Sequence, residues 1–293
     1  MRFLAKLMMS VAAVFLLAGP SSGTELTIGL IPEQNVFKQT ARYRPLGDYI
    51  AKKTGIRVKF TILSRYGNII DRFTTEKLDG VFFGSFTGAL AIQKLGVEFI
   101  ARPVNLDGSS TYWGYIFVRK DSGIRTVTDM KGKRLAFVDK ATTAGYVFPV
   151  AYLKENGVND IKTYFREAYF AGSHDAAIYA VLDGKADVGC AKHSMFDRVA
   201  RTDPRVKKDL VILAQSPQVP SNGLGVRKDM SPVLKRQLRD VLIGMDKDPE
   251  GKEILKKFEA VQFIPTSTEN YTIVVDYARK AGIDLKAYTY INK

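Results

Sequence analysis

Short apolar runs alternate with amphipathic segments along the chain, and this alternation predicts an α/β architecture with largely parallel sheets flanked by helices. Apolar runs bounded by glycine, proline or polar residues predict strands, whereas apolar positions three and four apart predict helices. The predicted strands are 26–31, 58–63, 80–84, 98–104, 115–119, 134–138, 188–191, 211–214 and 223–227. The predicted helices are 44–54, 69–76, 87–95, 143–155, 175–183, 232–247, 249–258 and 269–281, so the last third is mostly helical.

The first 23 residues have the layout of a secretory signal peptide. Arg2 and Lys6 precede the apolar run 7–18, and small residues follow up to Gly23, near which we expect cleavage. The apolar run is shorter than the roughly 20 residues of a spanning helix, and no other stretch approaches that length. Because no cysteine lies near the cleavage region, a lipid anchor is disfavoured. We therefore expect an exported, periplasmic chain without membrane insertion after processing.

The composition favours a small acidic partner. The chain carries 44 Lys+Arg against 30 Asp+Glu, a net charge of +14, and removal of Arg2 and Lys6 leaves +12. A positive field raises the encounter rate of a small anion, although excess lysine could also serve solubility alone. Nucleic acid is disfavoured, because the chain lacks a basic run interleaved with aromatic residues. The only cysteine, Cys190, cannot form an internal disulfide, so stability comes from an ordinary core.

A pattern of helix, turn, aspartate and apolar strand occurs twice, around Asp79 and around Asp187. Either aspartate alone could simply start a strand or cap a turn. Together they predict two α/β lobes of similar plan, with strand ends that face a shared crevice. Two extended segments, 111–120 and 216–228, are the expected crossings and would act as a hinge. We assign 24–116 and 220–293 to lobe one and 117–219 to lobe two.

The segment 134–146 predicts an anion site. A buried-strand pattern runs there into Thr142, Thr143, Ala144 and Gly145, which open a helix. Free backbone N–H groups at a helix start, with hydroxyls beside them and the positive end of the helix dipole behind, attract an oxyanion. Thr142 and Thr143 offer hydroxyls, whereas Ala144 and Gly145 offer only backbone N–H groups.

The mature chain resembles the periplasmic binding proteins of phosphonate, phosphite and phosphate ABC transporters, a family within the type II periplasmic-binding-protein fold. The resemblance is carried by Thr142-Thr-Ala-Gly-Tyr146, where the family usually has S-T-S-G-Y, and by Gly172-Ser-His-Asp175. It implies a two-lobed clamshell that holds an oxyanion at this helix start. It also implies that His174 binds the ligand, and a nearby anion would favour the protonated imidazole.

The resemblance implies further contacts from lobe one and from the second crossing. Tyr66 matches a family tyrosine whose hydroxyl reaches the oxyanion. The strand end at Phe83 and Ser85 matches the segment that closes over it, although many relatives have tyrosine where this chain has Phe83. Asn222 stands where the family often has the aspartate of I-P-S-D. Its neutral amide weakens the case for aminoalkyl phosphonates, because the carboxylate that would neutralise their ammonium is absent.

The expected function is therefore capture of a phosphorus oxyanion and its delivery to an ABC transporter permease, by a monomer without cofactor or metal. Phosphate, phosphite, methylphosphonate, a larger phosphonate and an unrelated anion remain open as ligands. An alternative is a sensory partner of a membrane receptor such as a sensor kinase. An exported enzyme is disfavoured, because the chain has no G-x-S-x-G elbow, P-loop or G-x-G-x-x-G turn, and two histidines with one cysteine make a zinc site improbable.

Overall fold

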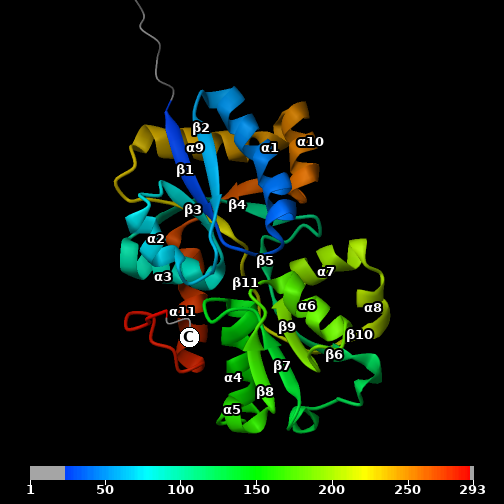
Figure 1. Ribbon diagram of the computed structural model, residues 1–293. Helices are drawn as coiled ribbons and strands as arrows, with labels where there is room; N and C mark the ends of the chain where they lie inside the picture. Colours follow the sequence, from blue (N-terminus) through cyan, green and yellow to red (C-terminus); the bar gives the residue numbers. More distant parts are fainter. Residues whose placement is uncertain (1–23, 291–293) are drawn as a thin grey trace, which may run out of the picture.

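Two mixed β-sheets, each flanked by helices, organise the chain in the computed structural model, which describes residues 24–290 (Figure 1). The predicted signal peptide, 1–23, lies outside the described residues. The first sheet has the order β13-β4-β12-β3-β1-β2 and the second β10-β6-β9-β7-β8. The strands of the first sheet are β1 (Glu25–Leu30), β2 (Arg57–Ile62), β3 (Gly80–Phe83), β4 (Glu98–Asn105), β12 (Gly223–Val226) and β13 (Ala260–Pro265). The strands of the second are β6 (Gly114–Arg119), β7 (Arg134–Phe137), β8 (Glu167–Phe170), β9 (Val188–Lys192) and β10 (Leu210–Gln215).

The expected α/β class is confirmed, but the sheets are less parallel than predicted. β1 pairs in parallel with β2 and β3, and β7 pairs in parallel with β8 and β9. β12 and β13 run antiparallel to their neighbours in the first sheet, as does β6 in the second. The reason is that β6 and β12 enter their sheets directly from the extended crossings, without the helical crossover that parallel pairing needs.

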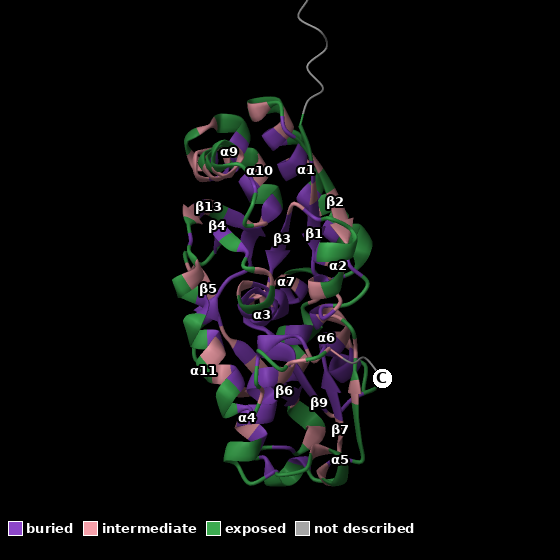
Figure 2. Cartoon of the chain, turned by 90° about the vertical axis from the view of Figure 1, so that its left-hand side faces the viewer, coloured by how far each residue is buried: buried purple, intermediate pink, exposed green. Residues whose placement is uncertain are grey.

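Helices cover both faces of the first sheet. Successive residues of β3 point to opposite faces of this sheet. Phe82 packs with α1, α9 and α10 on one face, whereas Val81 and Phe83 pack with α2 and α3 on the other. Figure 2 shows the central strands β1 and β3 and helix α3 as deeply buried, whereas the outer faces of α9 and α10 are exposed. These helices are α1 (Val36–Thr54), α2 (Ile69–Thr75), α3 (Ser85–Leu95), α9 (Pro232–Ile243) and α10 (Pro249–Phe258).

The second sheet is covered in the same way. Ile116 and Val118 of β6 pack with α4, whereas Phe117 between them packs with α6, α7 and α8. Helix α7 and the strands β8 and β13 lie outside the predicted elements. The helices of this lobe are α4 (Phe148–Glu155), α5 (Ile161–Tyr164), α6 (His174–Leu182), α7 (His193–Thr202) and α8 (Arg205–Asp209). Single turns occur at Lys120–Ser122, Thr128–Met130, Thr143–Val147, Met245–Lys247 and Thr268–Tyr271.

The two crossings pair with each other between the lobes. β5 (Thr111–Tyr112) and β11 (Val219–Pro220) form a two-stranded antiparallel ribbon. The expected boundary at residue 116 falls inside β6, which belongs entirely to the second sheet. The C-terminal helix α11 (Thr272–Lys280) contacts both α3 and α4, so it touches both lobes rather than lobe one alone (Figure 1). Within residues 24–290, no helix is long and apolar enough to cross a membrane.

The repeated aspartates anchor strands, one in each lobe. The Asp79 carboxylate accepts from the Thr27 backbone N–H at 2.9 Å and pairs with Arg227 at 3.1 Å. The Asp187 carboxylate accepts from the Arg134 backbone N–H at 2.8 Å and pairs with the Arg134 guanidinium at 3.0 Å. Both aspartates therefore tie the start of a strand to its neighbour. The carboxyl ends of the same strands, β3 and β9, lead to the region between the lobes.

Candidate functional site

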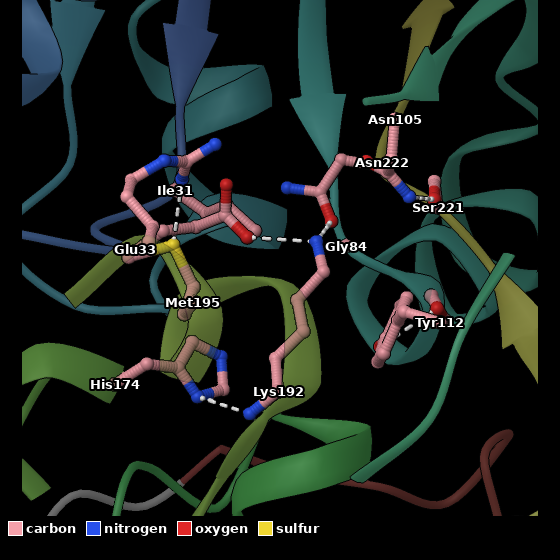
Figure 3. Close-up of polar contacts among 12 residues, drawn as sticks. Ile31, Glu33, Gly84, Asn105, Tyr112, His174, Lys192, Met195, Ser221 and Asn222 are labelled. Atoms are coloured by element: carbon pink, nitrogen blue, oxygen red, sulfur yellow. Dashed lines mark hydrogen bonds and ion pairs between the residues drawn. The ribbon is translucent and has the colours of Figure 1, made fainter. Parts of the chain in front are cut away.

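Strand ends from both lobes and the second crossing meet in one buried polar region (Figure 3). β1 is followed by Glu33, β3 by Ser85, and β9 ends at Lys192. All three residues are buried, as is Asn222, which precedes β12. This arrangement follows the rule that open α/β sheets place their sites beyond the carboxyl ends of strands.

Three buried polar groups in this region have no hydrogen-bond partner among the described residues. They are the Tyr66 hydroxyl, the Thr143 hydroxyl and the Asn222 Nδ2 group, and these residues are only 2%, 4% and 7% exposed. Tyr66 belongs to lobe one, Thr143 to lobe two and Asn222 to the crossing. A buried polar group without a partner costs about 1–3 kcal/mol, so three of them from separate segments indicate a place where a ligand supplies acceptors.

The predicted anion turn has an unusual local structure. Instead of continuous α-helix, residues Thr143–Val147 form a π-helical turn that leads into α4, a feature often found at functional sites. Its first helical hydrogen bond runs from the Val147 N–H to the Thr142 carbonyl at 3.0 Å. Gly145 is required here, since a Cβ atom would lie 2.4 Å from Cβ of Val138. The N–H groups that precede Val147 thus lie at a helix start, as expected.

The two threonines of the turn differ. The Thr142 hydroxyl donates to the Asp139 carbonyl at 2.6 Å, so it stabilises the turn instead of offering its proton to a ligand. The Thr143 hydroxyl lies toward the hydroxyl of Tyr112, without the geometry of a hydrogen bond. Ala144 is buried beside Gly114 and contributes only its backbone to this surface.

The contacts from lobe one also separate into two kinds. Ser85 Oγ lies 2.7 Å from the Pro220 carbonyl and 2.8 Å from the Tyr112 hydroxyl. Because a carbonyl only accepts, the Ser85 hydroxyl donates to Pro220 and accepts a hydrogen bond from the Tyr112 hydroxyl. Ser85 therefore holds the crossing against α3 and orients Tyr112. The ring of Phe83 packs in the core between Phe73 and Phe99, with ring centroids 6.2 and 5.9 Å away, and offers no polar group to a ligand.

His174 is buried at the start of α6, with the ring of Tyr66 edge-on at 6.1 Å. Its Nδ1 accepts from the Lys192 backbone N–H at 3.2 Å, so a neutral imidazole carries its proton on Nε2. Burial lowers the pKa of His174 to about 4, although Glu33 opposes the shift. Without a bound anion, this environment therefore favours the neutral imidazole, and the expected effect of an anion on its protonation stays a prediction. A neutral ring can still donate from Nε2.

A buried ion pair that the sequence pattern does not predict lies at the centre of the site. Lys192 Nζ lies 3.1 Å from Glu33 Oε1 and 3.0 Å from Asn222 Oδ1, and it sits over the Tyr112 ring at 4.5 Å (Figure 3). Burial alone would raise the pKa of Glu33, but Lys192, Arg42 and other cations lower it to about 2. Glu33 follows the apolar strand β1, and Lys192 is the last residue of the apolar strand β9. A charged residue at the carboxyl end of an apolar strand is the sequence signal that could have identified both.

Comparisons with known proteins identify the family of the chain. Residues 28–271 match a family model described as "ABC transporter, phosphonate, periplasmic substrate-binding protein". The chain belongs to this family. It is 26% identical over 247 residues to the phosphonates-binding periplasmic protein of Escherichia coli (strain K12), covering 83% of this chain and 72% of the relative. It is 29% identical over 215 residues to the phosphate-import protein of Mycolicibacterium smegmatis, covering 66% and 67%.

A solved structure establishes the fold of this family for the chain. The Prochlorococcus marinus protein in complex with methylphosphonate superposes with a TM-score of 0.78 at 24% identity. The match covers 89% of this chain and 99% of that chain. The expected two-lobed binding-protein fold is therefore confirmed. The family is one of substrate-binding components of ABC transporters, which act in the periplasm.

Proposed function

We propose that this chain is a periplasmic receptor that captures a phosphorus oxyanion between its lobes and delivers it to an ABC transporter permease. The observation that carries the proposal is the set of unpartnered groups on Tyr66, Thr143 and Asn222. Each can donate a hydrogen bond, and each comes from a different segment. A tetrahedral oxyanion presents several acceptor oxygens in different directions, and this is the shape that three such donors fit.

Phosphorus oxyanions are the class that the relatives' names suggest, since these read phosphonates and phosphate, and one solved relative holds methylphosphonate. The site's charge agrees with this class. Lys192 offers a buried cation, and Asn222 brings no negative charge of its own. The remaining contacts would come from the helix start at Thr143 and from Nε2 of His174. The formal charge of +14, or +12 without Arg2 and Lys6, favours encounter with anions.

The proposed mechanism is binding without turnover. Burial raises the pKa of the Cys190 thiol, which keeps it protonated and unreactive. The hydroxyls of Ser85 and Thr142 donate to carbonyl oxygens rather than to a base, so neither is activated as a nucleophile. We further propose that the receptor acts as a monomer.

Isothermal titration calorimetry of the chain from residue 24 tests the function. Phosphate, phosphite and methylphosphonate are the probes, and sulfate is the control for a non-phosphorus oxyanion. We expect saturable binding of one ligand per chain for at least one probe, with thermal stabilisation of about 2.7 kcal/mol at a hundredfold excess over Kd. Absence of binding and of thermal stabilisation with all three phosphorus probes would contradict the proposal.

A further inference from the structure

The cleft contains a charged group that belongs to the protein itself. Lys192 reaches from lobe two to Glu33 of lobe one, and its ammonium also donates to Asn222 of the crossing. The side chains of Lys192 and Glu33 are 8% and 7% exposed. Of the ion pairs between described residues, only this pair has both side chains less than a tenth exposed.

Such a pair is a poor way to stabilise a fold. Removal of two charges from water costs about as much as their attraction returns, and an apolar pair of the same size often serves stability as well or better. The rest of the lobe interface does not need it, because apolar residues around Tyr66, Tyr112, Ala144 and Val219 pack there. The position of the pair therefore calls for a role in ligand recognition.

The ammonium lies within the set of groups assigned to the ligand. Asn222 Oδ1 accepts from Lys192, and Nδ2 of the same amide is one of the unpartnered donors. The ammonium also sits over the ring of Tyr112, whose hydroxyl lies near Thr143, a second unpartnered group. Glu33, its counter-ion, is close enough to the hydroxyl of Tyr66 to act on it electrostatically.

We propose that Lys192 is a specificity-determining residue: its ammonium fills the place on Glu33 that a ligand ammonium would otherwise occupy, and the cleft thereby selects phosphorus oxyanions without a cationic substituent. The inference rests on the proposed function and specifies its substrate class. The sequence alone shows no carboxylate for a ligand amine, because Asn222 replaces the usual aspartate. The structure supplies one in Glu33, and the chain's own lysine neutralises it.

The two charges act in opposite directions on two kinds of ligand. The lysine attracts the oxyanion that all these ligands share, and it repels an ammonium substituent. Once the lysine is removed, the buried Glu33 carboxylate loses the cation that pairs with it, although Arg42 still acts on it, and it becomes a partner for a ligand ammonium. A comparison of two ligands with the same phosphonate head therefore isolates the effect.

The experiment measures Kd for methylphosphonate and for 2-aminoethylphosphonate by calorimetry in the wild type and in three variants, Lys192→Met, Glu33→Gln and the double variant. The relative affinity for the aminoethyl ligand should rise in the order Glu33→Gln, wild type, double variant, Lys192→Met. We expect the step from wild type to Lys192→Met to be about tenfold or more, and loss of the carboxylate in the double variant to remove most of that gain. Thr143→Val is the matched control, since it should weaken both ligands without change in their ratio.

The outcomes separate the two proposals. If the wild type binds methylphosphonate and the ratio stays within about threefold across the variants, the role of Lys192 is overturned and the proposed function stands. If the wild type binds no phosphorus oxyanion, the function and this inference fail together. Should Lys192→Met not fold, Glu33→Gln and the double variant decide the question, because a ratio that is equal in these two also overturns the role.

Discussion

Replacement of Thr143 by valine tests the site most directly, because it should affect the free protein and the complex in opposite ways. Valine has nearly the shape of threonine and lacks only the hydroxyl. In the free protein that hydroxyl is buried, in a residue only 4% exposed, and has no partner. Its removal takes away a desolvated polar group, so the free energy of unfolding should stay unchanged or rise by up to about 1 kcal/mol.

In the complex the same substitution leaves an oxygen of the ligand without its donor. The cost of an unpaired polar partner is about 1–3 kcal/mol, more when it is charged, which corresponds to a Kd raised about 5- to 150-fold. Calorimetric titration with the ligand that the wild type binds most tightly measures the Kd. Urea unfolding without ligand measures the stability of the same samples.

Thr142→Val is the matched control for this pair of measurements. The Thr142 hydroxyl donates to the Asp139 carbonyl at 2.6 Å, so its loss should lower the free energy of unfolding by about 0.5–1.5 kcal/mol and change affinity less than Thr143→Val does. The reasoning fails if Thr143→Val destabilises the free protein as much as Thr142→Val does while the Kd stays at the wild-type value.

Three further predictions concern stability and reactivity. Burial lowers the pKa of His174 from 6.5 to about 4, so the contribution of its neutral ring to stability is full above pH 6.5 and is lost as the pH falls toward 4. Across that range, the free energy of unfolding measured in urea should fall by about 3 kcal/mol more in the wild type than in His174→Asn. Asp187→Asn and Asp79→Asn should each lower the free energy of unfolding by about 1.5–3 kcal/mol with unchanged ligand Kd, and a changed Kd would place these aspartates in the site. Cys190 is buried in β9, so a colorimetric thiol reagent should label it only after denaturation, and fast labelling of the native protein would contradict the structure.

Local patterns predicted most of the fold because apolar periodicity reports which residues face a core. The helix at Pro249–Phe258 has the predicted bounds, and most predicted strands agree with the observed ones within a residue or two. The strand β8 was not recognised because its residues Glu167–Phe170 are mostly exposed at a sheet edge, where apolar periodicity is weak. The mixed pairing was missed for another reason, since it depends on how the crossings return to each sheet.

The candidate site was only partly predictable. The helix start at Thr143 and the positions of Tyr66, His174 and Asn222 can be recognised in the sequence, and the structure brings them into one buried region. What each hydroxyl does there depends on its partner across the fold. Thr142 and Ser85 are already engaged by carbonyls, and no local pattern contains that information.

The polar contacts between the lobes suggest how ligand binding and closure are coupled. Glu33 pairs with Lys192 across the lobes, and the Asp175 carboxylate accepts from the Asn35 N–H at 3.1 Å, so we expect both contacts to break when the lobes separate. The buried ion pair contributes little net stability, because desolvation offsets its attraction. The unpartnered groups at the site then oppose closure by about 1–3 kcal/mol each, a cost that falls away when an oxyanion accepts their hydrogen bonds. A ligand shifts such an equilibrium only through its differential affinity for the two states, and these groups provide that difference. Tyr66→Phe and Thr143→Val should therefore each favour closure without ligand and weaken ligand binding at the same time, whereas Asn222 also accepts from Lys192 and is not such a test.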